Sequence, residues 1–387
     1  IGRAFSDLGK HEEALKYQME ALVLRKKVLG DDHLDVAMSL NNVGCTFADL
    51  GKHEEDLKYQ MEALVLRKKL LGDDHPDMAT SLSNIGEAFI ALGKYEEALK
   101  YLMEALMLSK KLLGDDHPSV ATSLSNIGGA FIALGKYKKA LKYLIEALVL
   151  LKKLLGEEHP DVATSLNNVG YAFGALGKHE EALKYQMEAL VLRKKLLGGD
   201  HPFVASSLNN VGGAFEALGK HEEALKYLIE ALILRKKLFG KEHPSVAMSL
   251  NNVGSTFGEL GNHEEALKCL MKALELSKKL LGGDHPSVAS SLNNVGTTLG
   301  ALGKHEEALK YLMEALVLRK KLLGDEHPDV ASSLSNVGLT LKRLGKHEKA
   351  VKYLMEALAL KRKFLGAEHF DVATSLNNVG LTFGDLG

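Results

Sequence analysis

Apolar residues along the chain recur at helical spacing, in segments separated by glycine. In the stretch 76–92, Leu82, Ile85, Phe89 and Leu92 lie three or four residues apart. This spacing puts them on one face of an α-helix, and the proline that opens the stretch suits a first helical turn, where its missing N–H needs no partner. The pattern predicts a first helix, called helix A, with one apolar stripe.

A second helix, called helix B, is predicted for residues 95–113. Its leucines and alanines cover a broader face, with glutamates in the first turn and lysines in the last. These charges complement the helix dipole. A glycine separates the two helices at Gly93, and Gly114 is expected to end helix B as a left-handed (αL) cap.

The pattern of helix A and helix B repeats every 42 residues, without insertion or deletion, from Gly9 to Gly387. All 7 prolines occupy one position of the repeat. One helical hairpin cannot bury its apolar face alone, whereas stacked hairpins form a continuous core. The sequence therefore predicts an all-α fold, an α-solenoid of antiparallel helix pairs that forms a single array of about nine repeats over residues 1–387.

Each helix A also carries a glycine near its middle, in the motif NVG or NIG. A glycine inside a helix costs about 1 kcal/mol against alanine. Because this cost recurs in every repeat, it predicts a steric reason, namely the close approach of helix A to a neighbouring helix.

The recurring motif SLxNxGxxFxxLGKxEEALKYxxEAL resembles the tetratricopeptide repeat. In residues 82–106 the matching positions are Leu82, Gly86, Phe89, Gly93, Tyr95, Ala98, Ala105 and Leu106. The longer period, with LGxxHPxVAxSLNNxG, is similar to the repeats of kinesin light chains and of the sensor arrays on some NTPase-type immune receptors. The resemblance covers the whole chain. It implies a right-handed superhelix in which the A helices line a concave groove, where tetratricopeptide proteins bind peptides.

Asp56 departs from this pattern, because alanine stands at the equivalent position of other repeats, such as Ala98. The resemblance implies that this small residue packs against helix A. A buried aspartate is costly unless it is paired. The packing around Asp56 is therefore expected to differ from that of the other repeats.

Variation among the repeats is greatest on one face of helix A, at three positions spaced i, i+3 and i+4. The candidate groove residues at these positions are Cys45, Glu87, Tyr171, Glu216, Glu259, Lys342 and Arg343. A nearly constant asparagine lies on the same face, three residues upstream: Asn42, Asn84, Asn126, Asn168, Asn210, Asn252, Asn294, Asn336 and Asn378. An amide both donates and accepts hydrogen bonds, so it suits a peptide main chain. The alternative is that these asparagines bond neighbouring helices and that the variation reflects relaxed constraint.

The charges of the expected groove are mostly acidic, with one basic spot at Lys342 and Arg343. A site that grips an acidic cargo peptide or a C-terminal carboxylate needs repeated lysines or arginines. These are largely missing from the variable positions. The pattern therefore argues against a cargo-binding role of the kinesin type.

Composition excludes several classes of partner. The net charge is −1, so no overall field draws nucleic acid or an anionic membrane. The basic RKK runs, such as Arg67–Lys69, end helix B, where cations are favoured, and are expected to be solvated on the convex surface. No apolar run approaches the ~18 residues of a membrane span.

The cysteines bear on the compartment. Cys45 and Cys269 make no disulfide framework, and the sequence shows no signal-peptide pattern. Together these observations weakly favour a cytoplasmic location.

The loop between repeats raises the question of chemistry, because Asp73, Asp74 and His75 stand side by side. The first acidic position varies among repeats, whereas the second is always aspartate or glutamate and histidine always follows. Too few fixed ligands remain for a metal. The sequence predicts that the second carboxylate caps helix A, and it predicts no enzyme, no metal and no cofactor.

Both ends of the sequence stop at helix A, without a polar capping helix. The array is thus expected to be either truncated or able to stack head to tail with another copy.

The sequence as a whole leaves three hypotheses about function. The first is a non-enzymatic scaffold that binds a peptide or protein in the groove. The second is a structural protein whose repeats stack into a filament, and the third is the sensor segment of a larger NTPase-type receptor.

Overall fold

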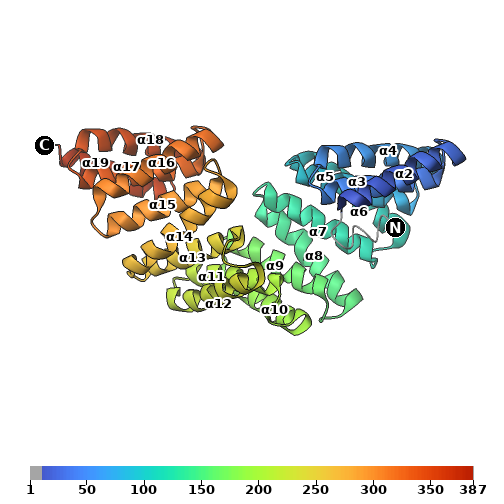
Figure 1. The fold of residues 1–387 in the computed structure, drawn as a ribbon, viewed down its shortest axis with the longest axis horizontal. Coiled ribbons are helices and arrows are strands. Elements are labelled where there is room, and N and C mark those ends of the chain that lie inside the picture. The colour runs from blue at the N-terminus through green and yellow to red at the C-terminus, as the bar shows by residue number, and fades with distance from the viewer. Residues whose placement is uncertain (1–10, 387) are drawn as a thin grey trace. The chain divides into compact units, whose positions relative to one another are not determined.

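The computed structural model describes residues 11–386 and shows α-helices joined by short turns, with no strand among these residues (Figure 1). The A helices have odd labels: α3 (Leu34–Asp49), α5 (Pro76–Ala91), α7 (Pro118–Ala133), α9 (Pro160–Ala175), α11 (Pro202–Ala217), α13 (Pro244–Glu259), α15 (Pro286–Ala301), α17 (Pro328–Arg343) and α19 (Phe370–Gly384). The B helices have even labels: α2 (His11–Leu29), α4 (His53–Leu71), α6 (Tyr95–Leu113), α8 (Tyr137–Leu155), α10 (His179–Leu197), α12 (His221–Phe239), α14 (His263–Leu281), α16 (His305–Leu323) and α18 (His347–Leu365). The all-α prediction is confirmed, and α6 has the bounds predicted for the helix B of residues 95–113.

The chain forms two compact units, Ile1–Leu196 and Leu197–Gly387. Within each unit, a helix packs against the helices before and after it, and successive A helices also touch, as α13 and α15 do. The prediction of one array over all 387 residues stays a prediction. Each unit has its own core of buried leucine, valine and alanine side chains from both helix types.

The glycine near the middle of helix A allows the helices of one hairpin to approach closely, as predicted. A Cβ atom placed on Gly128 would lie 2.6 Å from Cγ of Leu144, far inside van der Waals contact. Leu144 is fully buried. Gly212, Gly254, Gly296 and Gly338 meet a leucine of helix B in the same way.

Two kinds of glycine end the helices. At the end of α5, Gly93 has φ 72°, its N–H bonds the carbonyl of Ile90, and the N–H of Lys94 bonds the carbonyl of Phe89. This is a Schellman motif. At the end of α6, Gly114 has φ 85° and ψ 166°. The predicted αL cap is therefore wrong for helix B, because this conformation lies outside the αL region, although it too is one that glycine adopts almost alone.

The cap of helix A is the histidine, not the preceding carboxylate. Nδ1 of His75 accepts the N–H of Asp77 at 3.2 Å, and the equivalent histidines of the other described repeats do the same. Asp74 instead pairs with Lys111 of the next helix B at 2.7 Å. The prediction of a carboxylate cap was wrong, since a lysine one repeat later reaches the carboxylate.

This pairing recurs along the chain and explains why the position is always acidic. We call it the loop ladder. It consists of Lys69–Asp32, Lys111–Asp74, Lys153–Asp116, Lys195–Glu158, Lys237–Asp200, Lys279–Glu242, Lys321–Asp284 and Lys363–Glu326.

Three arginines of the RKK runs, Arg67, Arg193 and Arg235, are buried, contrary to the prediction that these runs are solvated. Arg67 is 8% exposed and donates from Nη1 to the hydroxyl of Ser81 at 2.6 Å. Burial lowers the pKa of Arg67 and of the equivalent Arg235. The stem of arginine is long enough to reach the next helix A, so the run contributes a structural contact there. The lysines after it, such as Lys68 and Lys69, are exposed as expected.

Candidate functional site

The predicted groove residues all lie on A helices. In the first unit, Cys45 on α3 and Glu87 on α5 are exposed, and Tyr171 on α9 is 52% exposed. In the second unit, Glu216 on α11 is half-buried and Glu259 on α13 is exposed. Helix A thus presents these variable positions on a face that helix B does not cover.

The asparagines on this face bond the preceding A helix. Nδ2 of Asn84 donates to Oδ1 of Asn41 at 2.9 Å, and Nδ2 of Asn336 donates to Oδ1 of Asn293 at 3.0 Å. The same bond joins Asn252 to Asn209 and Asn294 to Asn251. These contacts favour the alternative in which the amides connect neighbouring helices.

The bond changes where the preceding repeat carries serine instead of asparagine. Position 83 is serine, and Asn126 donates to Oε1 of Glu87 at 2.6 Å instead. Partial desolvation of the Glu87 carboxyl by neighbouring protein atoms raises its pKa, although the residue is exposed, and the bond from Asn126 opposes the shift. Burial also raises the pKa of Glu216, against the bond from Thr256. Both carboxyl groups therefore hold a proton more tightly than a fully solvated glutamate does.

The basic spot is engaged within the chain. Nζ of Lys342 lies 3.1 Å from a carboxylate oxygen of Asp385, and Nη1 of Arg343 donates to the carbonyl of Gly300 at 3.3 Å. A ligand that used these cations would compete with these contacts.

Two adjoining pockets lie on the helix-A face of the second unit. One, of about 260 Å³, is lined by residues of α13 to α15 that include Ser255, Glu259 and Asn294. The other, of about 150 Å³, is lined by residues of α15 to α17 that include Asn336 and Arg343. Thr297 of α15 lines both. The structure thus brings together predicted residues from three successive repeats.

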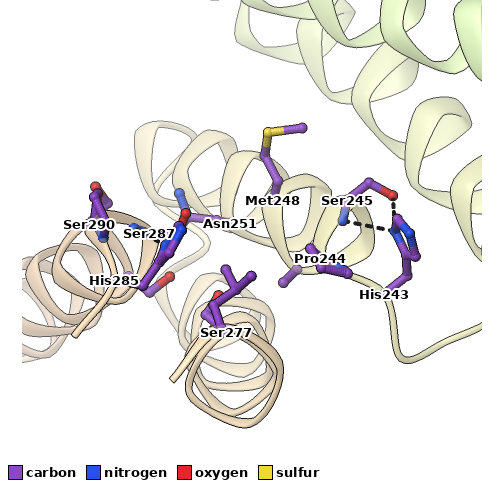
Figure 2. Close-up of a pocket in the computed structure, with 13 residues that line it drawn as sticks. His243, Pro244, Ser245, Met248, Asn251, Ser277, His285, Ser287 and Ser290 are labelled. Atoms are coloured by element: carbon purple, nitrogen blue, oxygen red, sulfur yellow. Dashed lines mark hydrogen bonds between the residues drawn. The ribbon is translucent and has the colours of Figure 1, made fainter. Parts of the chain in front are cut away.

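A larger pocket, of about 710 Å³, was not predicted from the sequence. It lies at the N-terminal ends of α13 and α15, where Ser277 of α14 lies between Pro244 and His285 (Figure 2). The available signal was a departure from the RKK runs: Ser277 stands where five other B helices carry an arginine.

No group of three histidine, cysteine, aspartate or glutamate side chains in residues 11–386 could hold a metal ion. Over the same residues, no helix is long and apolar enough to cross a membrane. The loop histidines use Nδ1 to cap helix A, as His75 does. The side chains that line the two pockets around Thr297 include hydroxyl, amide and carboxyl groups.

Several solved structures have folds similar to this one. The apo form of the quorum sensor NprR from B. thuringiensis matches with a TM-score of 0.63 and 16% identity, over 92% of this chain and 99% of that chain. A Rap protein complexed with Competence and Sporulation Factor matches with a TM-score of 0.56 and 13% identity, over 91% and 98%. A putative kinesin light chain of Podosopora anserina matches with a TM-score of 0.49 and 25% identity, over 54% and 98%.

The chain matches no curated protein sequence. A family model described as tetratricopeptide repeat matches it in overlapping stretches that span its length: 1–64, 49–111, 77–152, 119–195, 161–232, 203–271, 250–321, 288–363 and 329–387. The matches agree with the hairpins, the turn glycines and the mid-helix glycines described above. The chain therefore belongs to the tetratricopeptide repeat family.

Proposed function

We propose that this protein is a non-enzymatic scaffold that binds a peptide or protein segment along its A helices. The observation that carries the proposal is the pair of pockets that share Thr297 on the second unit. They continue from α13 to α17 along the face where the repeats differ most from one another. A ligand in both pockets would contact three repeats at once.

The lining groups fit a partner with polar main-chain groups. Ser255 and Thr297 offer hydroxyls that donate or accept, and Glu259 offers an acceptor. The asparagine amides can share their lone pairs with a ligand while they bond the preceding helix. Such a surface suits an extended segment, since each residue of an extended chain presents a donor and an acceptor.

The fold is compatible with this role, because one of the similar structures is a Rap protein in complex with Competence and Sporulation Factor. That likeness is of fold alone and does not identify the ligand. The partner is therefore to be selected by experiment, from a displayed library of random peptides.

The proposal is tested by blocking the shared wall of the two pockets. Thr297→Arg places a long cation in both, and selected peptides are expected to bind at least about tenfold more weakly, measured by fluorescence anisotropy. Val317→Arg is the matched control, because Val317 is 63% exposed on helix B of the same unit. Peptides that bind the wild type and Thr297→Arg equally well would overturn the proposal.

A further inference from the structure

The larger pocket of the second unit lies where other repeats hold a buried cation. In at least four repeats an arginine of helix B donates from Nη1 to the hydroxyl of a serine 14 residues later, at 2.6–2.8 Å. It also donates to the carbonyl 10 residues later, at 3.1–3.5 Å. In the last hairpin Lys361 makes the same contact with the hydroxyl of Ser375 at 3.1 Å. We call this arrangement the cation seat.

The cation is missing from three repeats, at Ser109, Leu151 and Ser277. The serines that would accept from the first two are Ser123 and Ser165. Their hydroxyl oxygens are buried and have no hydrogen-bond partner. The seat therefore keeps its acceptor where the cation has been lost.

At Ser277 the lost side chain leaves an open space. Ser277 and Ser291 are each 2% exposed, and both line the pocket of about 710 Å³. This volume falls within the ~300–1,000 Å³ typical of ligand sites. It exceeds one arginine side chain, so an occupant could also place neighbouring groups against the wall.

The polar end of the pocket carries the same two positions that accept hydrogen bonds from the arginine in an occupied cation seat. Ser291 is the counterpart of Ser333, and Ser287 is the counterpart of Asp329, whose carbonyl accepts from Arg319. Both serines line the pocket. A guanidinium group has donors in a fixed planar fork, which can serve a hydroxyl and a carbonyl together.

The rest of the wall suits an aliphatic stem. Met248, Leu281 and the two prolines Pro244 and Pro286 line it (Figure 2 labels Pro244 and Met248). The neighbouring His243 and His285 accept backbone N–H groups at Nδ1, as Figure 2 shows, so they are held in place by the helix starts. Arginine buries such a stem while its head group is hydrogen-bonded.

We propose that this pocket binds the side chain of an arginine supplied by a peptide or protein partner. The partner's guanidinium takes the place that Arg235 and Arg319 fill within the chain. The inference goes beyond the proposed function, because this pocket does not share lining residues with the two pockets around Thr297.

The first experiment uses small probes and the full chain. N-acetyl-arginine methylamide is titrated while the methyl signal of Met248 is followed by NMR, with Met248→Leu to assign it. A saturable shift is expected. The citrulline analogue, which has the same shape without the charge, is expected to bind at least about tenfold more weakly. Equal shifts with both probes would overturn the proposal.

Two variants test the location. Ser277→Arg restores the missing cation and is expected to abolish probe binding while it raises the melting temperature. Ser109→Arg, the matched control in the first unit, is expected to leave the Met248 response unchanged. Ser291→Ala keeps the pocket open but removes one acceptor, so it should weaken binding several-fold. Undiminished binding by Ser277→Arg would overturn the assignment.

The source of the arginine is tested by comparing Gly-Arg-Gly with free L-arginine, using the same methyl signal. An arginine within a peptide is expected to bind more tightly, because its flanking groups can contact the remaining wall. Free L-arginine carries a charged amino group and a charged carboxyl group, whereas the arginine inside Gly-Arg-Gly carries neither. Tighter binding of free L-arginine than of Gly-Arg-Gly would contradict a peptide or protein partner.

Discussion

The α3–α4 hairpin and the α7–α8 hairpin have the same helix lengths but different interiors. Under Gly128 of α7 lies Leu144, whereas under Gly44 of α3 lie Gln60 and Asp56, which are 1% and 4% exposed. The glycine and the turns are the same in both hairpins. The comparison shows that the backbone of the repeat does not depend on an apolar contact at this point.

The polar interior is only partly satisfied. Nε2 of Gln60 donates to the carbonyl of Asn41 at 3.2 Å and contacts Sγ of Cys45 at 3.4 Å. One carboxylate oxygen of Asp56, Oδ1, is buried and has no hydrogen-bond partner. Burial raises the pKa of Asp56 to about 6, while the neighbouring Gln60 and His53 oppose the shift. The hairpin therefore folds with a carboxyl group that binds a proton more tightly than an exposed aspartate does.

The largest expected effect comes from removing this carboxyl group. Asp56→Ala restores the residue of the other repeats and is expected to stabilise the protein by up to about 3 kcal/mol near pH 7, since each pKa unit corresponds to about 1.4 kcal/mol. Because the folded pKa of about 6 exceeds the usual 3.8, the folded state binds the proton more tightly. The free energy of unfolding of the wild type should therefore fall as pH rises between about 4 and 6.

Urea denaturation at about pH 4 and about pH 7 measures this difference. The gain from Asp56→Ala should be small at the lower pH and large at the higher. Asp56→Asn serves as control, because it removes the titration and keeps the shape. A gain that is the same at both pH values would show that the carboxyl group is not responsible.

A smaller effect is expected at the leucine side of the comparison. Gly128→Ala forces a methyl group against Leu144 and is expected to cost about 2 kcal/mol. A Cβ atom on the adjacent Gly129 of the same helix would instead have no neighbouring atom within 4 Å. Gly129→Ala should therefore stabilise the protein by up to about 1 kcal/mol, because alanine favours the helix.

The variants at the two neighbouring glycines distinguish the effect of helix propensity from the effect of close packing against Leu144. Thermal unfolding followed by circular dichroism should give shifts of opposite sign. If both alanines destabilise the protein equally, close packing under Gly128 is not the reason for the glycine.

The helices and turns could be predicted from the sequence because their signals are local. The start of α6 at Tyr95 and its end at Leu113 follow from glycines and charges within a few residues. The solenoid class followed from the period. The paired pockets around Thr297 lie on the helix face that the variation among the repeats marks in the sequence, and the assignment of that face to a ligand stays a prediction.

The remaining features depend on contacts between positions far apart in the sequence. The burial of Arg67 follows from Ser81, 14 residues later, and the role of Asp74 follows from Lys111, 37 residues later. A single repeat gives no sign of either partner. The pocket at Ser277 could have been found by asking which side chain the other repeats place there.

The smallest expected effect concerns the loop ladder, which is the same beside both hairpins. Lys69 of α4 pairs with Asp32, and Lys153 of α8 pairs with Asp116, with side chains about equally exposed. Exposed pairs contribute about 0.2–1 kcal/mol. Asp32→Asn and Asp116→Asn should therefore cost the same small amount in urea denaturation, and the loss should shrink at about 1 M salt.

Variants of the loop ladder also test whether the polar interior of the α3–α4 hairpin changes the contacts between repeats. Asp32 pairs with Lys69 at the surface, whereas Asp56 lies beside Gln60 inside the hairpin, so the effects of Asp32→Asn and Asp56→Ala should add in the double variant. The comparison variant, Asp116→Asn with Gly129→Ala, should add as well. If only the double variant of the α3–α4 hairpin departs from additivity, the buried carboxyl group of Asp56 alters the joint between repeats. The polar interior would then affect the backbone of the repeat, contrary to what the comparison of the two hairpins indicates.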